Sequence, residues 1–177
     1  EPTIYPVGAQ GLSWAIAEWT DGKLFRNVIE TVFSDTRDTM PEGFWKDRGR
    51  LYFGADYDGE NIQANLGQNL SDIRAQFGYI DMRVSEGRDF MLGEVPGLPD
   101  ALCYYLVWFF RRRYSGGTQF LEQFPSLRTW EQRMADIGHG TPQNMSSNHA
   151  LDVAANAEPT IQEQADPGEP LGLVPGA

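Results

Sequence analysis

Cysteine is nearly absent from this chain, since Cys103 is the only one in 177 residues. A single cysteine cannot form a disulfide within the chain, and Cys103 lies inside an apolar run. We therefore interpret it as a small core side chain rather than a nucleophile. The chain is long enough to bury a sizeable core without disulfide bonds. The lack of disulfides is compatible with a reducing compartment, and we expect a cytoplasmic protein.

Positive charge is also scarce. The chain has 14 lysines and arginines against 25 aspartates and glutamates, which gives a net charge of −11. Surfaces that bind phosphate backbones are built from clustered cations, so this balance excludes nucleic acid as an expected partner. Three consecutive arginines at residues 111–113 end an apolar segment, and we interpret them as favourable charges at a helix C-terminus.

Long apolar runs are missing. The longest, residues 101–110, has ten residues without charge, glycine or proline, whereas a membrane span needs about twenty. We therefore expect no membrane association. The first ten residues carry no basic segment followed by an apolar stretch, so no signal peptide is visible. The chain opens on Glu1 and stops on Ala177 in a way that suggests a piece of a longer protein.

Several catalytic signatures are missing as well. There is no Gly-Xaa-Ser-Xaa-Gly elbow to anchor a hydrolase triad and no glycine loop with a following lysine to hold a phosphate. His139 and His149 lie ten residues apart, which is not a metal-ligand spacing. We expect no metal site and no cofactor in this chain.

What the sequence does contain is helical periodicity. Apolar residues recur every three or four positions over residues 12–33, 62–84 and 125–137, which predicts a helix in each segment. The unbroken apolar run 101–110 predicts another, and shorter helices are expected over 44–53, around 120–124 and from the N-cap candidates at 146–147 to about 157. The pattern over 62–84 is the clearest. Gly22 lies inside the first segment and permits a bend or a break there. In the segment from Pro125, an inner stripe is predicted at Leu127, Trp130, Met134 and Ile137. The fold class is therefore all-α, a helical bundle.

We predict that the segment at 101–110 belongs to a central helix that is buried on all sides. Gly97 is placed to be its N-cap, and Pro99 falls in the first turn, where its missing N–H costs nothing. Asp100 lies three residues after the cap, so its carboxylate can reach back to the N–H of Gly97. We expect residues 1–140 to form the helical domain. Residues 141–177 are expected to add one helix and an extended tail with prolines, glycines and five acids but no lysine or arginine.

Three short motifs, each weak alone, occur in an informative order: Phe90-Met91-Leu92-Gly93, then Gly97-Leu98-Pro99-Asp100, then Phe124-Pro125-Ser126-Leu127 with Trp130 and Arg133. Over about residues 6–140 this order resembles the C-terminal helical domain of glutathione S-transferases. One departure is Gly97, which stands where the family's capping box has a hydroxyl residue.

The resemblance implies that an N-terminal thioredoxin-like domain, which binds glutathione and carries the activating residue, is missing from this chain. The chain would then be the inactive helical half, from a parent that transfers glutathione to a small electrophilic substrate and forms a homodimer. By the same analogy, Trp14, Glu18, Tyr104 and Trp108 are candidate substrate-binding residues. Two alternatives remain. In the first, the aromatic side chains are core residues and Glu18 lies on a solvated helix face; in the second, the chain is a non-catalytic helical module that binds a protein or a ligand.

Overall fold

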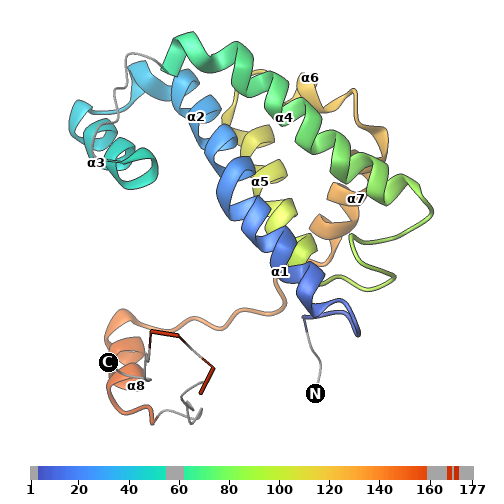
Figure 1. Cartoon of the computed structure of the whole chain (residues 1–177). Coiled ribbons are helices and arrows are strands. Elements are labelled where there is room, and N and C mark those ends of the chain that lie inside the picture. Colours follow the sequence, from blue (N-terminus) through green and yellow to red (C-terminus); the bar gives the residue numbers. More distant parts are fainter. Residues whose placement is uncertain (1–3, 55–61, 159–166, 169, 172–177) are drawn as a thin grey trace. The chain divides into compact units, whose positions relative to one another are not determined.

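The computed structural model describes residues 4–54, 62–158, 167–168 and 170–171. Its helical elements are α1 Gln10–Trp19, the π-helical turn η1 Thr20–Leu24, α2 Phe25–Thr36, the 3-10 turn η2 Arg37–Thr39, α3 Glu42–Phe53, α4 Ile62–Ser85, α5 Leu98–Arg113, α6 Gly117–Leu121, α7 Pro125–Asp136 and α8 Ser147–Ala155 (Figure 1). No strand occurs among these residues, apart from an isolated bridge between Phe90 and Gly93. The predicted all-α helical bundle is therefore confirmed.

The chain divides into two compact units, Glu1–Gly138 and His139–Ala177. The first contains α1 to α7. In the second, α8 begins where the Ser146 hydroxyl accepts a hydrogen bond of 3.2 Å from the N–H of His149, which confirms the predicted last helix. No residue of α8 is buried. The predicted extended tail lies largely outside the described residues, and the domain boundary after residue 140 stays a prediction.

α1, η1 and α2 follow one another without a gap, so the first segment is one long helix with a π turn in its middle (Figure 1). Gly22 lies within this turn, which means that the permitted bend or break takes the form of a change in helix type. Thr20 and Leu24 are both fully buried there. The Thr20 hydroxyl contacts the carbonyl oxygens of Ile16 and Ala17 at 2.9 Å each, so the buried polar atom is satisfied.

Around the core of the first unit, the long helix contacts α4 and α5, and α7 contacts both α4 and α5. The rings of Phe77 in α4 and Phe110 in α5 meet edge to face with centroids 5.4 Å apart, inside this ring of helices. The apolar stripe predicted for α4 is confirmed, because Ile73, Phe77 and Ile80 are fully buried. Trp130 of α7 is fully buried as well, which places all three segments in one core.

The prediction that residues 101–110 are buried on all sides is wrong. Leu106 and Phe110 are fully buried, but Tyr105 and Trp108 are each 37% exposed. The helix has packed neighbours on only part of its circumference, and in an α-helix positions three apart share a face. One face of this apolar segment is therefore exposed to solvent. The sequence did not indicate this face, because no charged residue marks it.

The start of α5 follows the predicted cap. The Gly97 N–H donates to Oδ2 of Asp100 at 3.0 Å, which is the predicted half of the capping box. The N–H of Leu98, an otherwise unpaired donor of the first turn, donates to the carbonyl oxygen of Ile4 at 2.8 Å. A Cβ atom at position 97 would lie 2.9 Å from that same oxygen and 3.3 Å from the Pro6 ring. The chain start therefore occupies the space of the usual capping side chain.

This packing predicts that Gly97→Ser has opposite effects in two contexts. In the full chain it should lower the free energy of unfolding by about 1–2 kcal/mol, because the side chain collides with Ile4 and Pro6. In a chain that starts at residue 9, the same change should stabilise by a few tenths of a kcal/mol, because a serine hydroxyl caps a helix better than glycine. Urea denaturation of the four proteins measures both values. An equal effect in both chains would contradict the role given to Ile4.

The interface between the long helix and α4 contains a buried chain of side-chain hydrogen bonds. Trp19 Nε1 donates to Gln76 at 2.8 Å, and Gln76 donates to Asn27 at 3.1 Å. Asn27 in turn donates to Asn69 at 3.0 Å, and Asn69 donates to the carboxylate of Glu30 at 2.8 Å. Each side-chain amide in this hydrogen-bond network must be paired to avoid a desolvation cost. The network therefore fixes the register of the long helix against α4.

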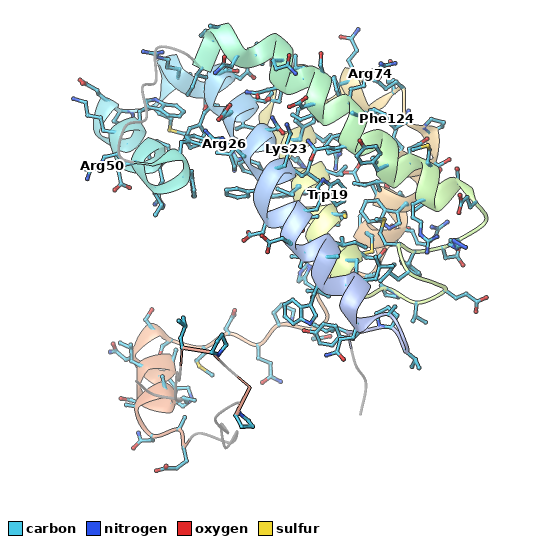
Figure 2. The ribbon with its side chains drawn as sticks, viewed as in Figure 1. Trp19, Lys23, Arg26, Arg50, Arg74 and Phe124 are labelled. Carbon is cyan, nitrogen blue, oxygen red and sulfur yellow. The ribbon has the colours of Figure 1, made fainter. Side chains whose placement is uncertain are left out.

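Two ion pairs lie beside that network. Trp19, Lys23 and Arg26 follow one another along the long helix (Figure 2). Lys23 Nζ lies 2.8 Å from Asp72 of α4, and Arg26 Nε lies 3.0 Å from a carboxylate oxygen of Glu30. The hydrogen bond from Lys23 lowers the pKa of Asp72 below its ordinary value. This pair therefore contributes stability at neutral pH, and the contribution is lost as the pH falls through the lowered pKa.

The helix predicted over residues 44–53 is confirmed as α3. It packs on α2 through aromatic side chains: the ring of Phe33 in α2 lies 4.5 Å from the ring of Trp45 and 6.0 Å from that of Phe53. The indole N–H of Trp45 also donates to the carbonyl oxygen of Arg37 at 2.9 Å. α3 thus belongs to a second, smaller core next to the main one.

Candidate functional site

The long helix and α5 run side by side in the same direction (Figure 1). At their beginnings, Ile4 and Gly97 are in contact, and at their ends the Ser115 hydroxyl donates to the Asp35 carboxylate at 3.0 Å. The residues predicted to bind substrate lie on these two helices, Trp14 and Glu18 on α1 and Tyr104 and Trp108 on α5.

On α1, the two predicted residues lie one turn apart. Trp14 is 55% exposed and Glu18 is also exposed, and positions four apart share a helix face. The ring of Trp14 lies 5.7 Å from the ring of Tyr5 in the preceding segment. Trp14 is therefore partly sheltered by the chain start, while most of its surface stays open to solvent.

On α5, the two predicted residues are in different surroundings. Trp108 is on the exposed face, whereas Tyr104 lies at its edge, half-buried, with its ring 6.4 Å from the ring of Trp130 in α7. Tyr105 is at the centre of the exposed face, three residues before Trp108. The structure therefore groups Tyr105 with Trp108. The sequence signal for Tyr105 was its helical spacing from Trp108, which applies equally well to its neighbour Tyr104.

Tyr105 has a perturbed hydroxyl. Partial burial is the main cause that raises the pKa of Tyr105 above its ordinary value, and the negative charge of Asp21 in η1 raises it further. The phenol therefore keeps its proton at neutral pH and can donate a hydrogen bond. We call the group formed by Trp14, Glu18, Asp21, Tyr105 and Trp108 the aromatic face. It offers apolar rings, one hydroxyl donor and two carboxylates.

Other kinds of chemistry have no support in the part of the chain that the structure describes. Cys103 is fully buried, and burial raises the pKa of its thiol, so it is not a thiolate nucleophile. Among the described residues, no group of three or more His, Cys, Asp or Glu side chains could hold a metal ion. No helix within those residues is long and apolar enough to cross a membrane.

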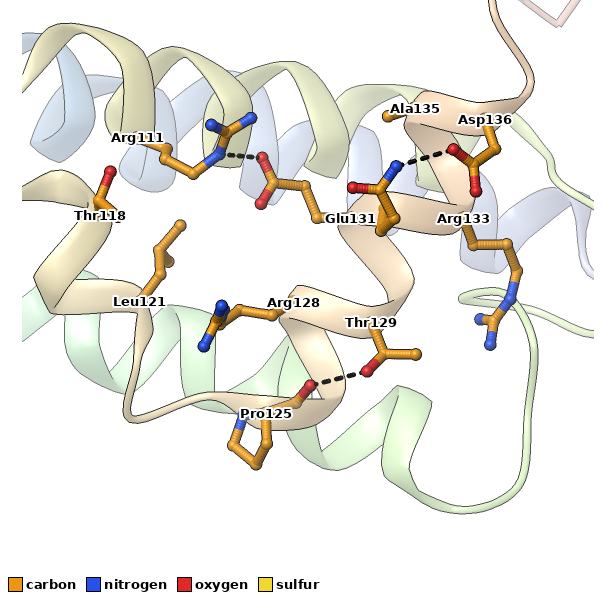
Figure 3. Close-up of a pocket in the computed structure, with 11 residues that line it drawn as sticks. Arg111, Thr118, Leu121, Pro125, Arg128, Thr129, Glu131, Arg133, Ala135 and Asp136 are labelled. Carbon is orange, nitrogen blue, oxygen red and sulfur yellow. Dashed lines mark hydrogen bonds and ion pairs between the residues drawn. The ribbon is translucent and has the colours of Figure 1, made fainter.

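A separate hollow of about 820 Å³ lies among α5, α6 and α7 (Figure 3). Its lining residues are Arg111, Thr118, Leu121, Pro125, Arg128, Thr129, Glu131, Gln132, Arg133, Ala135 and Asp136. None of them belongs to the aromatic face, and none was predicted from the sequence to bind a ligand. We call it the α7 hollow.

No protein-family model matches the sequence, and no curated protein matches it. The fold, however, is similar to the crystal structure of a GST-like protein from Pseudomonas syringae, with a TM-score of 0.61 and 23% sequence identity. The match covers 98% of this chain and 53% of that protein, so the chain spans about half the length of the protein that it resembles. This likeness shows a GST-like fold, and the all-helical structure fits the C-terminal domain of such a protein.

Proposed function

We propose that this chain is the helical, substrate-binding half of a glutathione S-transferase-like protein. The observation that carries the proposal is the likeness in fold to a GST-like protein of which the chain spans about half. In the proposed parent protein, a thioredoxin-like domain binds glutathione, and the complete protein transfers glutathione to a small electrophile. We further propose that the parent is a cytoplasmic homodimer.

The aromatic face is the proposed site for the electrophile. Trp14, Tyr105 and Trp108 are too exposed to be explained as core residues alone. Aromatic rings provide a large contact area for an apolar ligand, and the Tyr105 hydroxyl can donate to an oxygen on it. Tyr104, which the analogy had also suggested, would contribute only from the edge of this face.

The activation of glutathione is proposed to lie outside this chain. Nucleophilic transfer needs a group that stabilises a thiolate. The aromatic face has a single hydroxyl donor, Tyr105, beside two carboxylates, which repel a thiolate. Cys103 cannot take part because it is buried in the core. We therefore expect the isolated chain to show no glutathione binding by calorimetry and no turnover of an electrophile. Binding together with turnover would place the chemistry within these 177 residues and overturn this assignment.

The electrophile site itself is tested by the substitution Trp108→Ala. The probe is 1,3-dinitrobenzene, an unreactive analogue of nitroaromatic electrophiles, and its binding is followed by NMR titration of the whole chain. We expect Trp108→Ala to weaken binding by about tenfold, because a stacked ring is worth about 1–1.5 kcal/mol. The matched control is Tyr79→Ala on α4, which removes an aromatic ring that is 56% exposed. Equal losses in both variants would contradict the proposed site.

The second candidate function is a non-catalytic module that docks onto a partner protein. It is favoured by the same face, since exposed Trp and Tyr side chains are also typical of the centres of protein interfaces. The dinitrobenzene titration separates the two functions. A small-molecule site is saturable by the probe and depends on Trp108, whereas a flat docking surface gives no saturable binding of a ligand of this size.

A further inference from the structure

The α7 hollow is distinct from the aromatic face and has a different chemical character. Its floor contains Leu121, which is 1% exposed, and its rim carries charged side chains. Figure 3 shows Arg111 entering from α5, Thr118 and Leu121 from α6, and Arg128 from α7. Three helices therefore converge on one opening, and a volume of about 820 Å³ is within the range of small-molecule sites.

Three arginines and two carboxylates line this hollow, in a chain whose net charge is −11. Glu131 is buried and pairs with Nε of Arg111 at 2.7 Å. Asp136 accepts a hydrogen bond of 2.7 Å from Gln132, and Arg133 is turned to Asp89, whose carbonyl oxygen it contacts at 2.6 Å. Each of these charged groups therefore already has a partner within the protein.

Arg128 is the exception. No hydrogen bond or ion pair joins its guanidinium to any described residue, and in Figure 3 it extends from α7 toward the side of the hollow where Leu121 lies. The terminal Nη groups of Arg111, beyond the Nε that Glu131 engages, also have no described acceptor. Two arginines on different helices thus line one hollow, and both have donors without a described acceptor.

The position of Arg128 in its helix does not explain its presence. α7 begins at Pro125, so Arg128 stands in the first turn, at the positive end of the helix dipole. A cation at this end is unfavourable by a few tenths of a kcal/mol. The first turn is already capped by Asp81, whose carboxylate accepts from the N–H of Leu127 at 2.8 Å. Arg128 therefore makes no visible contribution to the stability of the fold.

We propose that the α7 hollow binds a small organic anion with a phosphate or carboxylate head. The planar fork of Arg128 holds two oxygens of the head, a geometry that guanidinium groups share with both kinds of anion. Arg111 and Thr118 line the same hollow, so their donors are available to further polar groups of the ligand, and Pro125 offers apolar surface to its body. This inference does not depend on the proposed function, because no residue is shared.

The test is an NMR titration of the full chain with phenyl phosphate and, separately, with benzoate. The signals followed are the guanidinium Nε–H groups of Arg128 and Arg111. We expect saturable shifts at both arginines with at least one probe, and the tighter probe identifies the head group. Arg128→Gln should weaken that binding by about tenfold, as expected for the loss of one charged, bidentate hydrogen-bonded contact.

The matched control is Arg113→Gln, which removes an exposed arginine of α5 that does not line the hollow. It should leave the affinity unchanged. Two results would overturn the proposal: shifts that do not saturate with either probe, or equal losses in Arg128→Gln and Arg113→Gln, which indicate unspecific attraction of an anion to any arginine. Thermal denaturation shows whether each variant is folded, and no hydrogen bond or ion pair to a described residue is lost with the Arg128 guanidinium.

Discussion

Replacing Asp100 by alanine is expected to lower the free energy of unfolding by about 3–5 kcal/mol, because two buried N–H donors and one partly buried donor lose their acceptor. The carboxylate is 1% exposed. Its Oδ1 accepts from the N–H of Met91 at 2.8 Å and from the indole N–H of Trp130 at 2.9 Å, and its Oδ2 accepts from Gly97. One side chain therefore joins the connector before α5, the start of α5 and the middle of α7. Urea denaturation measures the loss.

Two further substitutions make this prediction specific. Asp100→Asn keeps one acceptor oxygen, so it should cost less than alanine but more than a surface change. Asp136→Ala removes an exposed carboxylate whose one partner among the described residues is Gln132, one turn earlier in α7, and should change stability by less than about 0.5 kcal/mol. A loss below about 1 kcal/mol in Asp100→Ala would mean that water replaces the carboxylate at this position.

The second large effect is expected at Gly117, the first residue of α6. A Cβ atom there would lie 2.6 Å from the carbonyl oxygen of Phe110 and 2.9 Å from Cα of Arg111. Both are backbone atoms of α5 and cannot turn aside, so α6 would have to shift. We expect Gly117→Ala to lower the free energy of unfolding by about 2–3 kcal/mol.

Gly22→Ala is the matched control for this substitution. Gly22 also lies in a helical segment, but a Cβ atom there meets nothing within 4 Å. Alanine should therefore stabilise the chain by about 0.5–1 kcal/mol, because it restricts the unfolded state. Thermal denaturation of both variants measures the two changes. Effects of the same sign would show that the close approach of α6 to α5 is not what requires glycine at position 117.

The helices could be predicted because their signals are local. α4 follows from apolar residues at helical spacing over its whole length, and the start of α5 follows from Gly97, Pro99 and Asp100. The remaining partners of Asp100 could not be predicted, because Trp130 is 30 residues away in sequence and only the fold brings it near. Ile137 was wrongly placed on an inner stripe, since it is 53% exposed and α7 ends before it.

The candidate sites were less accessible to sequence reasoning. Whether Tyr104 or Tyr105 faces solvent depends on which side of α5 the other helices cover, and no local pattern encodes this. The α7 hollow joins Arg111, Thr118 and Arg128, which lie on three helices. From the sequence, arginines near position 111 could be interpreted only as helix-end charges, because the acceptor of Arg111, Glu131, is supplied by α7.

The π turn at Thr20–Leu24 has a consequence for how the long helix is aligned with other sequences. A π turn accommodates one residue more than an α-helical turn, so the apolar stripes before and after it are offset by one position. Trp19 and Asn27 can both reach Gln76 across this offset. A homologue that is one residue shorter at this turn can therefore form a regular α-helix and keep both apolar stripes on the core. An alignment that places the one-residue gap elsewhere in the helix would misassign the buried residues.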